Sequence, residues 1–313
     1  MTAEGTPDGT AAASGSLPPP GPLGRVLTAM VTAFHDDGSV DLDGTARVAA
    51  WLVDHGNDGV VVSGTTGESP TTSVAEDGEI LRAVLDAVGD RATVVAGVGT
   101  NATAHSVELT EQAQKLGADG VLVVTPYYNK PTQEGVLAHF QAVARAAAVP
   151  VMLYDIPGRT AIPIATDTYR RIAEEDNVVA VKDAVGDLAR GVSIMAETGL
   201  AFYSGDDVMN LGWLTHGGSG VVSVVGHVAG RQYAEMHGAV AAGDLARALS
   251  IYSSLLPLVD VVMGRAQGAM TAKAALQLLG VLDNRNVRLP LVPASDALVA
   301  ELRDVMAATG LLS

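Results

Sequence analysis

Four short segments of the sequence carry side chains of the kind that act on carbonyl compounds. They are SGTTGES with Thr65 and Thr66, TPYYNKP with Tyr128, YDIPGRT with Tyr154 and Arg159, and VKDAVG with Lys182. A neutral lysine amine attacks a keto group to form a Schiff base, and hydroxyls nearby can move the protons that this requires. An arginine beside them suits a carboxylate in a two-point contact. Chemistry on a keto compound bearing a carboxylate is therefore the first hypothesis.

Lys182 is one of four lysines, and it follows the apolar run VVAV where a strand would leave a protein interior. In water its pKa would be about 10.4, which leaves about 0.1% of the amine neutral at pH 7.5. Desolvation in an interior would lower that pKa and favour the nucleophile. Alternatively, Lys182 pairs with Asp183 or another carboxylate, or extends from the rim into water. Its position alone leaves both interpretations open.

The other polar residues also have structural explanations. Tyr154 and Tyr128, taken singly, fit packing residues with a hydroxyl at the rim. SGTTGES could be a turn, and it lacks the GK[ST] that completes a P-loop. Arg159 could be a surface arginine after a Pro-Gly turn. Their significance therefore depends on whether the fold brings them together.

Metal chemistry finds little support in the sequence. The seven histidines are scattered, without HExxH or a ligand-like pair near the other candidates, so a zinc-dependent aldolase is disfavoured. The acidic pair Asp206–Asp207 could suggest a metal, but such pairs at a helix start usually cap it or lie in its first turn. We expect neither a metal nor a cofactor.

The elements that must position these residues alternate along the chain. Between longer segments of helical periodicity lie eight apolar runs, at 26–34, 58–64, 93–99, 119–126, 150–157, 177–184, 200–207 and 219–225. Strands that are apolar throughout indicate a parallel sheet covered on both faces. Eight strand–helix units predict an α/β fold, a (β/α)8 TIM barrel. An open doubly wound sheet is disfavoured because no GxGxxG follows the first run.

The sequence divides into three parts. Residues 1–23 are rich in Pro, Gly, Ser and Ala and predict a disordered tail. Residues 24–242 predict the barrel, and 243–313 predict a C-terminal helical extension of three helices. Chemistry in such a barrel lies at the carboxyl ends of the strands, where the residues above occur. Gly205 follows the seventh run, and Val222 lies in the eighth.

Composition excludes several classes of partner. The formal net charge of −16, without any Lys/Arg run, disfavours nucleic acid and anionic membranes. The absence of cysteine excludes disulfides, thiolate metal sites and cysteine nucleophiles. The first residues lack the pattern of a signal peptide, and no run has the roughly 18–20 uninterrupted apolar residues of a membrane span. We expect a soluble, cytoplasmic protein.

Taken together, the four motifs resemble the 4-hydroxy-tetrahydrodipicolinate synthase (dihydrodipicolinate synthase) family, particularly its actinobacterial members, from about residue 24 to the C-terminus. The resemblance implies a class I aldolase-type lyase without a cofactor. It would condense pyruvate with L-aspartate 4-semialdehyde to give 4-hydroxy-tetrahydrodipicolinate, the step committed to diaminopimelate and lysine. It also implies a homotetramer, a dimer of tight dimers.

The resemblance assigns roles to the catalytic residues. Lys182 would form the Schiff base with pyruvate, and Tyr154 would donate and accept protons above it. Thr65 and Tyr128 would complete a proton relay, with Tyr128 reaching in from the adjacent subunit. The sequence departs from the family at Val185, where many members have Thr or Ser, and this affects only the expected structure of that loop.

The resemblance also assigns the binding residues. Thr66 would hold the pyruvate carboxylate, Gly205 and Val222 would line the pyruvate pocket, and Arg159 would receive the carboxylate of the semialdehyde. N-acetylneuraminate lyase has a similar barrel, Lys and Tyr but typically lacks this Arg, which favours the synthase. Another pyruvate-dependent class I aldolase, of the 2-keto-3-deoxy sugar acid or N-acetylneuraminate lyase type, is the alternative. A non-catalytic small-molecule sensor on the same barrel is a third hypothesis, disfavoured because every motif is retained.

A second departure concerns feedback by lysine. Family members that lysine inhibits use His and Glu side chains in a cleft at the dimer interface, at positions held here by Val74, Asp77 and His105. An ammonium ligand would lose its Glu partner and meet an imidazole instead, whereas Asn101 and Tyr127 fit the family pattern. The resemblance therefore predicts weak or absent lysine inhibition.

Overall fold

The computed structural model describes residues 21–312 of the chain. The predicted disordered tail, 1–23, lies outside the described residues except for its last three. Of these, Leu23 is buried inside the barrel, and its N–H donates a hydrogen bond of 3.2 Å to the hydroxyl of Tyr203. The folded body therefore begins before residue 24.

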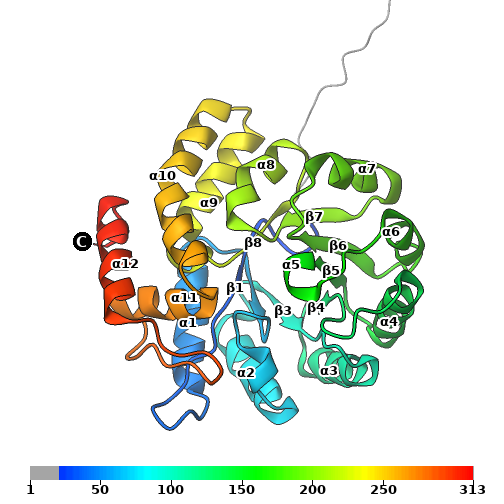
Figure 1. The fold of residues 1–313 in the computed structure, drawn as a ribbon, viewed down its shortest axis with the longest axis horizontal. Helices are drawn as coiled ribbons and strands as arrows, with labels where there is room; N and C mark the ends of the chain where they lie inside the picture. Colours follow the sequence, from blue (N-terminus) through cyan, green and yellow to red (C-terminus); the bar gives the residue numbers. More distant parts are fainter. Residues whose placement is uncertain (1–20, 313) are drawn as a thin grey trace, which may run out of the picture.

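Eight parallel strands close into a barrel in which each strand pairs with its neighbours in the sequence and β8 pairs with β1 (Figure 1). Each predicted apolar run contains one of them: β1 (Val26–Ala29), β2 (Gly59–Val62), β3 (Thr93–Gly97), β4 (Gly120–Val124), β5 (Val151–Asp155), β6 (Val178–Asp183), β7 (Ala201–Ser204) and β8 (Gly220–Ser223). The strands are almost wholly buried, as expected of a parallel sheet covered on both faces. The predicted TIM barrel is confirmed.

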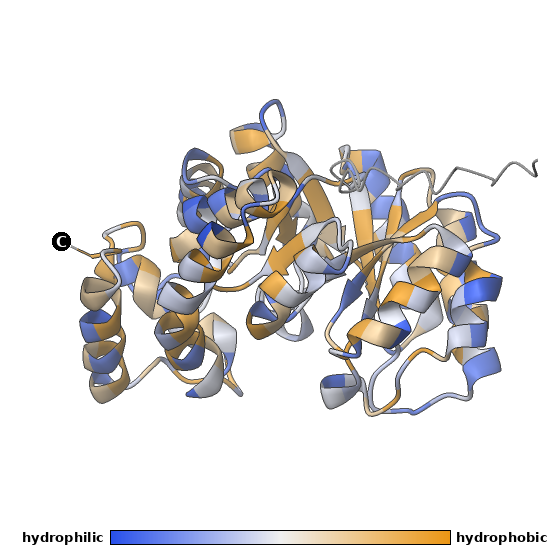
Figure 2. Cartoon of the chain, turned by 90° about the horizontal axis from the view of Figure 1, so that it is seen from above, coloured by the Kyte–Doolittle hydropathy of each residue, from blue (hydrophilic) through white to orange (hydrophobic). Residues whose placement is uncertain are grey.

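Helices surround the barrel and follow the strands. They are α1 (Leu42–Asp54), α2 (Val74–Val88), α3 (Thr103–Leu116), α4 (Gln133–Ala146), α6 (Thr166–Ile172), α7 (Leu188–Thr198), α8 (Asn210–Thr215) and α9 (Gly226–Ala241). Local signals set their ends: Ser73 and Glu76 form a capping box at the start of α2, and Gly117 ends α3 in the left-handed conformation. In Figure 2 the strands are mostly orange, whereas blue residues lie on outward helix faces.

The apolar core has two layers because side chains alternate along each strand. One layer lies between the sheet and the helices. The other fills the barrel interior, with Leu27, Val61, Val95, Leu122 and Met152 from successive strands. This inner packing closes the barrel below, so a cavity can form only at the strand ends.

The three predicted C-terminal helices are present as α10 (Leu245–Gly264), α11 (Gly268–Leu278) and α12 (Asp296–Ala308). They pack on one another and on α9 beside the barrel (Figure 1). The boundary predicted at 242/243 stays a prediction, and it falls in the turn between α9 and α10.

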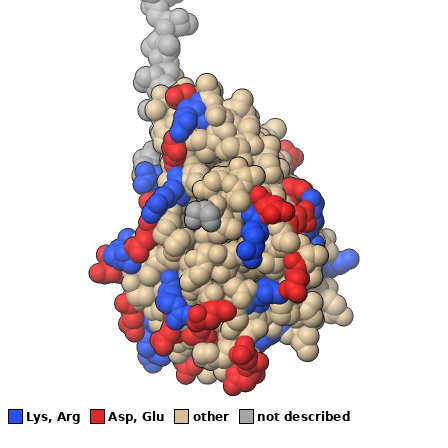
Figure 3. Space-filling model, turned by 90° about the vertical axis from the view of Figure 1, so that its left-hand side faces the viewer, with Lys and Arg blue, Asp and Glu red and all other residues tan. Residues whose placement is uncertain are grey.

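α10 is the one helix in the described part of the chain that is long and apolar enough to cross a membrane, by length and composition only. Packed helices of soluble proteins pass the same test, and α10 contacts α9, α11 and α12. On the side of these helices, Figure 3 shows acidic and basic side chains next to one another, without a large patch of one sign. Arg265, for example, pairs there with Asp260 and Glu301.

Candidate active site

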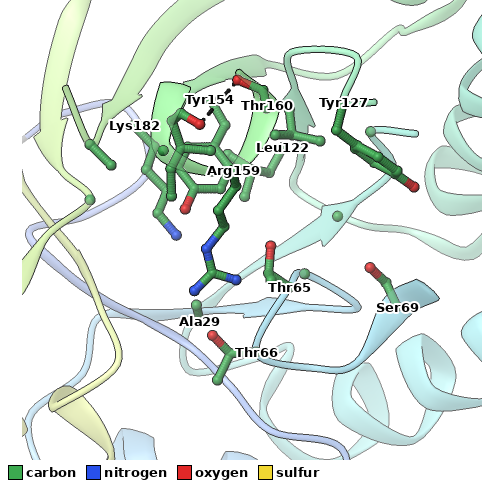
Figure 4. A pocket seen from close by; sticks show the side chains of 18 of the residues that line it. Ala29, Thr65, Thr66, Ser69, Leu122, Tyr127, Tyr154, Arg159, Thr160 and Lys182 are labelled. Atoms are coloured by element: carbon green, nitrogen blue, oxygen red, sulfur yellow. Dashed lines mark hydrogen bonds between the residues drawn. The ribbon is translucent and has the colours of Figure 1, made fainter. Parts of the chain in front are cut away.

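A cavity of about 740 Å3 opens at the carboxyl ends of the strands (Figure 4). Its wall includes seven of the eight residues that the sequence singles out: Lys182, Tyr154, Thr65, Tyr128, Thr66, Arg159 and Gly205. The eighth, Val222, is not among the lining residues. Residues of all four motifs thus line one cavity. No single motif in the sequence could show this.

Lys182 stands at the end of β6 with its side chain in the barrel, and it is 5% exposed. It pairs in register with Tyr154 on β5, and its Nζ lies 4.3 Å from the centroid of the Tyr154 ring. Burial, with the positive charge of Arg159, lowers the pKa of this amine to about 7, although Asp207 opposes the shift. A large fraction of Lys182 is therefore neutral and nucleophilic near neutral pH.

Asp183, the carboxylate next to Lys182 in the sequence, binds the loop that follows β6 and does not bind Lys182. Asp183 accepts hydrogen bonds of 3.1 Å from the N–H groups of Val185 and Gly186. The alternative of a Lys182–Asp183 ion pair is therefore wrong, as is that of a lysine extended into water. Gly186 has a φ of 82°, and Val185 supplies only its N–H to Asp183, which any residue except proline could do. This explains why the loop tolerates Val185.

Tyr154 faces Lys182 from the end of β5 and is also buried. Burial raises the pKa of its phenol to about 12, although Arg159 counteracts the shift. The phenol therefore carries its proton at neutral pH and can donate it to a reacting oxygen. Thr65 and Thr66 line the same cavity, from the loop that follows β2 (Figure 4).

Arg159 lies in the short helix α5 (Pro157–Thr160), which begins with a proline and is separated from the end of β5 by one residue. Its guanidinium points into the cavity with Lys182 and Thr65 (Figure 4). Among residues 21–312 it has no ion-pair partner, unlike the arginines on the outer helices. The guanidinium is thus free to bind a carboxylate that enters the cavity.

Tyr128 occupies the rim, where the loop after β4 projects from the body. Its side chain is 88% exposed and its φ is 74°, a left-handed conformation that is rare for a bulky residue. The neighbouring Asn129 fixes this turn, because its side chain donates a 2.9 Å hydrogen bond to the backbone oxygen of Asn101. The loop thus presents the phenol of Tyr128 outward from this chain.

Gly205 and Val222 are both predicted to line the pyruvate pocket, but the structure places only Gly205 at the cavity. Gly205 lies against Lys182, since a Cβ there would be 2.8 Å from the Lys182 Cγ. Val222 instead pairs with Leu27 inside the barrel, whereas Ala29, two residues further along β1, reaches the cavity. The structure thus places Val222 below the cavity, and Val224 contributes to the wall instead.

The acidic pair after β7 lies at the start of the short helix η2 (Asp207–Met209), as the sequence predicts, with Asp206 at the N-cap position and Asp207 in the first turn. Asp206 makes no capping hydrogen bond, and Asp207 is buried, accepting from the N–H groups of Val224 and Val225 at 3.0 and 3.1 Å. Asp207 thus fixes the loop after β8. Within the described ranges, no group of three His, Cys, Asp or Glu side chains could hold a metal ion.

The sequence does not single out Glu68 and Lys273, which lie behind the Thr65–Thr66 loop. Both are buried, and they form an ion pair. A glutamate in a turn and a lysine in a helix carry no local signal of burial, so only the tertiary structure reveals the pair.

Comparisons with known proteins agree with this geometry. A model of the dihydrodipicolinate synthetase family matches residues 22–309. The chain belongs to this family. The 4-hydroxy-tetrahydrodipicolinate synthase of Kineococcus radiotolerans is 58% identical over 93% of this chain and 94% of that protein. A relative in Streptomyces coelicolor, 4-hydroxy-tetrahydrodipicolinate synthase 2, is 56% identical over 93% and 97%.

Solved structures of the family have the same fold. A Bacillus anthracis dihydrodipicolinate synthase has a TM-score of 0.88 and 40% identity, covering 91% of this chain and 98% of that one. The enzyme of Cyanidioschyzon merolae, solved with lysine bound, has a TM-score of 0.89 and 42% identity, covering 93% and 99%. These matches confirm the predicted family, the barrel and the assignment to the lyases, so the non-catalytic sensor is discarded.

Proposed function

We propose that the chain condenses pyruvate with L-aspartate 4-semialdehyde to give 4-hydroxy-tetrahydrodipicolinate, in the cytoplasm and without a cofactor. The observation that carries the proposal is the environment of Lys182: a buried amine with a pKa of about 7, beside a protonated phenol and the guanidinium of Arg159, which has no ion-pair partner among residues 21–312. The family, whose named members are synthases of this product, supports the choice of substrates.

In this proposal the Lys182 Nζ attacks C2 of pyruvate, and the carbinolamine loses water to leave the imine. Tyr154 exchanges protons with the departing oxygen and later with the aldehyde oxygen of the second substrate. Thr65 passes protons between Tyr154 and the bulk through the Tyr128 of an adjacent subunit. That the rim loop presents Tyr128 outward supports the last step, and a homotetramer built from tight dimers would supply it.

Four residues would contact the substrates. Thr66 binds the carboxylate of pyruvate, and Gly205 lets the pyruvate approach Lys182 because it has no side chain. Val222 is proposed to act through its backbone, from below the cavity. Arg159 binds the carboxylate of the semialdehyde.

Borohydride reduction tests the central step. With pyruvate and borohydride, the peptide that contains Lys182 should gain the mass of a reduced pyruvate adduct. The Lys182→Met variant, treated identically, should gain none. An active wild-type chain whose Lys182 peptide shows no mass gain would refute the Schiff base.

A substrate panel separates the synthase from the alternative aldolases. Arg159→Ala should raise the KM for the semialdehyde and lower its kcat/KM, while the pyruvate adduct still forms. A wild-type chain that turns over a 2-keto-3-deoxy sugar acid or N-acetylneuraminate faster than the semialdehyde would favour the alternative.

We also propose that lysine inhibits this enzyme weakly or not at all. Asp77 is occupied by a 2.8 Å hydrogen bond from the Thr72 hydroxyl, and the His105 imidazole lies 3.2 Å from Glu108 on its own helix. Asp77 is therefore already hydrogen-bonded, and His105 is an imidazole that faces a glutamate of its own helix, so neither replaces the Glu partner that an ammonium group would lose. Half-maximal inhibition by submillimolar lysine in a coupled assay would contradict this proposal.

A further inference from the structure

The most buried ion pair in the described part of the chain lies behind the cavity wall. The Nζ of Lys273, on α11, lies 2.5 Å from Oε1 of Glu68, and both side chains are only 1% exposed. Glu68 ends the SGTTGE segment, three residues after Thr65, while Lys273 is 205 residues away along the chain. The pair therefore joins the C-terminal helical region to the loop that carries Thr65 and Thr66.

Both members of the pair have further partners. The other oxygen of Glu68, Oε2, accepts a 2.8 Å hydrogen bond from the backbone N–H of Arg288. Lys273 also donates to the backbone oxygen of Asn286 at 2.7 Å, and its Nζ lies 4.2 Å from the centroid of the Phe34 ring. Both carboxylate oxygens of Glu68 are thus held by residues that follow α10.

The side chain of Arg288 binds the segment that contains Asn286 and Arg288 to the barrel. Its guanidinium binds the Glu76 carboxylate and donates hydrogen bonds of 2.8 Å to the backbone oxygens of Thr71 and Gly38. The guanidinium holds the pKa of Glu76 at about 2, so the ion pair persists throughout the neutral range. The segment that binds Glu68 is therefore itself hydrogen-bonded to residues that precede and follow the Thr65–Thr66 loop in the sequence.

The Thr65–Thr66 loop needs an external support because its backbone is strained. Ser63 and Glu68, at its two ends, have φ values of 50° and 61°, in the left-handed region that non-glycine residues rarely adopt. Such conformations persist only where the surrounding structure imposes them. From the barrel side the loop receives a 2.9 Å hydrogen bond from the Thr32 hydroxyl to the oxygen of Gly67. From the other side it is held through the Glu68 carboxylate.

We infer that Lys273 and Arg288 are positioning residues, which hold Glu68 and thereby fix the backbone that presents Thr65 and Thr66 to the cavity. The C-terminal helical region is then part of the catalytic apparatus, although none of these three charged residues lines the cavity. The inference rests on the proposed function, because that reaction gives Thr65 and Thr66 their roles.

The test removes the cation while keeping the length of the side chain. In Lys273→Met the buried Glu68 carboxylate loses its partner, and the loop must move to solvate it. A displacement of about 1 Å at a catalytic group costs on the order of 10²-fold in rate. We expect kcat/KM for pyruvate to fall by about that factor, through a higher KM because Thr66 moves and a lower kcat because Thr65 moves. The KM for the semialdehyde should change less, because Arg159 belongs to α5.

A matched control uses Arg265, an exposed cation in the same region that pairs with Asp260 and Glu301. Arg265→Met should leave both KM values and kcat at wild-type levels. Glu68→Gln keeps the shape of the side chain, and the double variant Glu68→Gln/Lys273→Met also removes the unpaired charge. If Lys273→Met does not fold, these two variants provide the same measurement.

The double variant separates positioning from stability alone. It should regain the melting temperature lost in Lys273→Met but not the pyruvate KM, because two neutral side chains no longer tie the loop to α11. Wild-type pyruvate KM in every folded variant would refute the inference. A wild-type chain that forms no pyruvate adduct would instead overturn the proposed function, so the two failures are distinguishable.

Discussion

Replacing the nucleophile itself should make the protein more stable. Lys182 is buried at the end of β6, and in the described part of the chain it has neither a hydrogen-bond nor an ion-pair partner that would compensate its charge. Folding must therefore either desolvate an ammonium group or remove its proton. Methionine has a similar length and no charge, so Lys182→Met removes this cost while filling nearly the same space.

The size of the effect follows from the pKa. Burial lowers the pKa of Lys182 from 10.5 to about 7, and each unit corresponds to 1.36 kcal/mol. A group whose pKa is depressed in the folded state destabilises that state fully below pH 7, and the cost disappears as the pH rises toward 10.5. Lys182→Met should thus raise the free energy of unfolding by about 5 kcal/mol below pH 7, but by only about 2 kcal/mol at pH 9.

Guanidinium chloride unfolding without pyruvate, at pH 6.5, 8 and 9, measures this difference. Lys273→Met is the matched control, since that lysine is also buried, with a pKa that burial lowers to about 8, but is paired with Glu68. Removing one partner of a buried pair destabilises by about 3–5 kcal/mol, so the same substitution should act in opposite directions at the two sites. A Lys182→Met variant no more stable than wild type, or a gain independent of pH, would refute the reasoning.

Three further predictions concern the strand ends. Burial raises the pKa of Asp155 to about 7, so ionisation costs the folded state stability as the pH rises from 4 to 7; Asp155→Asn should gain up to about 4 kcal/mol in urea unfolding at pH 8 and nothing at pH 4. Tyr154→Phe should lower kcat by about 10²- to 10⁴-fold in steady-state assays, because the phenol proton is lost; an unchanged kcat would exclude Tyr154 as the acid. In Gly205→Ala the new Cβ would lie 2.8 Å from the Lys182 Cγ, so borohydride trapping should slow by about 10²-fold while circular dichroism stays native.

The sequence predicts the barrel because parallel strands need apolar residues on both faces. That requirement makes all eight strands visible as continuous runs, and the order of the runs fixes their neighbours. It also locates the site, since a polar residue directly after such a run must lie at the carboxyl edge. Lys182, Tyr154 and Thr65 are found in this way.

The depth of a residue within the barrel is not predictable from these runs. Val222 and Ala29 both lie within predicted apolar runs, yet Ala29 reaches the cavity whereas Val222 pairs with Leu27 and lies one layer below it. The level of each residue depends on the stagger between strands, which is a property of the closed sheet. The same limit applies to Glu68, whose left-handed backbone and buried carboxylate depend on partners more than 200 residues away.

The two buried lysines show how one chain can hold a reactive amine and still fold. Within residues 21–312 Lys182 has no carboxylate ion-pair partner, which keeps its pKa low and its amine reactive, but this destabilises the barrel mouth. Lys273 is also buried, and burial lowers its pKa only to about 8 because the Glu68 carboxylate opposes the shift. A carboxylate beside Lys182 would stabilise the fold yet raise the pKa of the amine and suppress the nucleophile. The stabilising ion pair therefore has to lie outside the cavity, and the C-terminal helices supply it behind the catalytic loop.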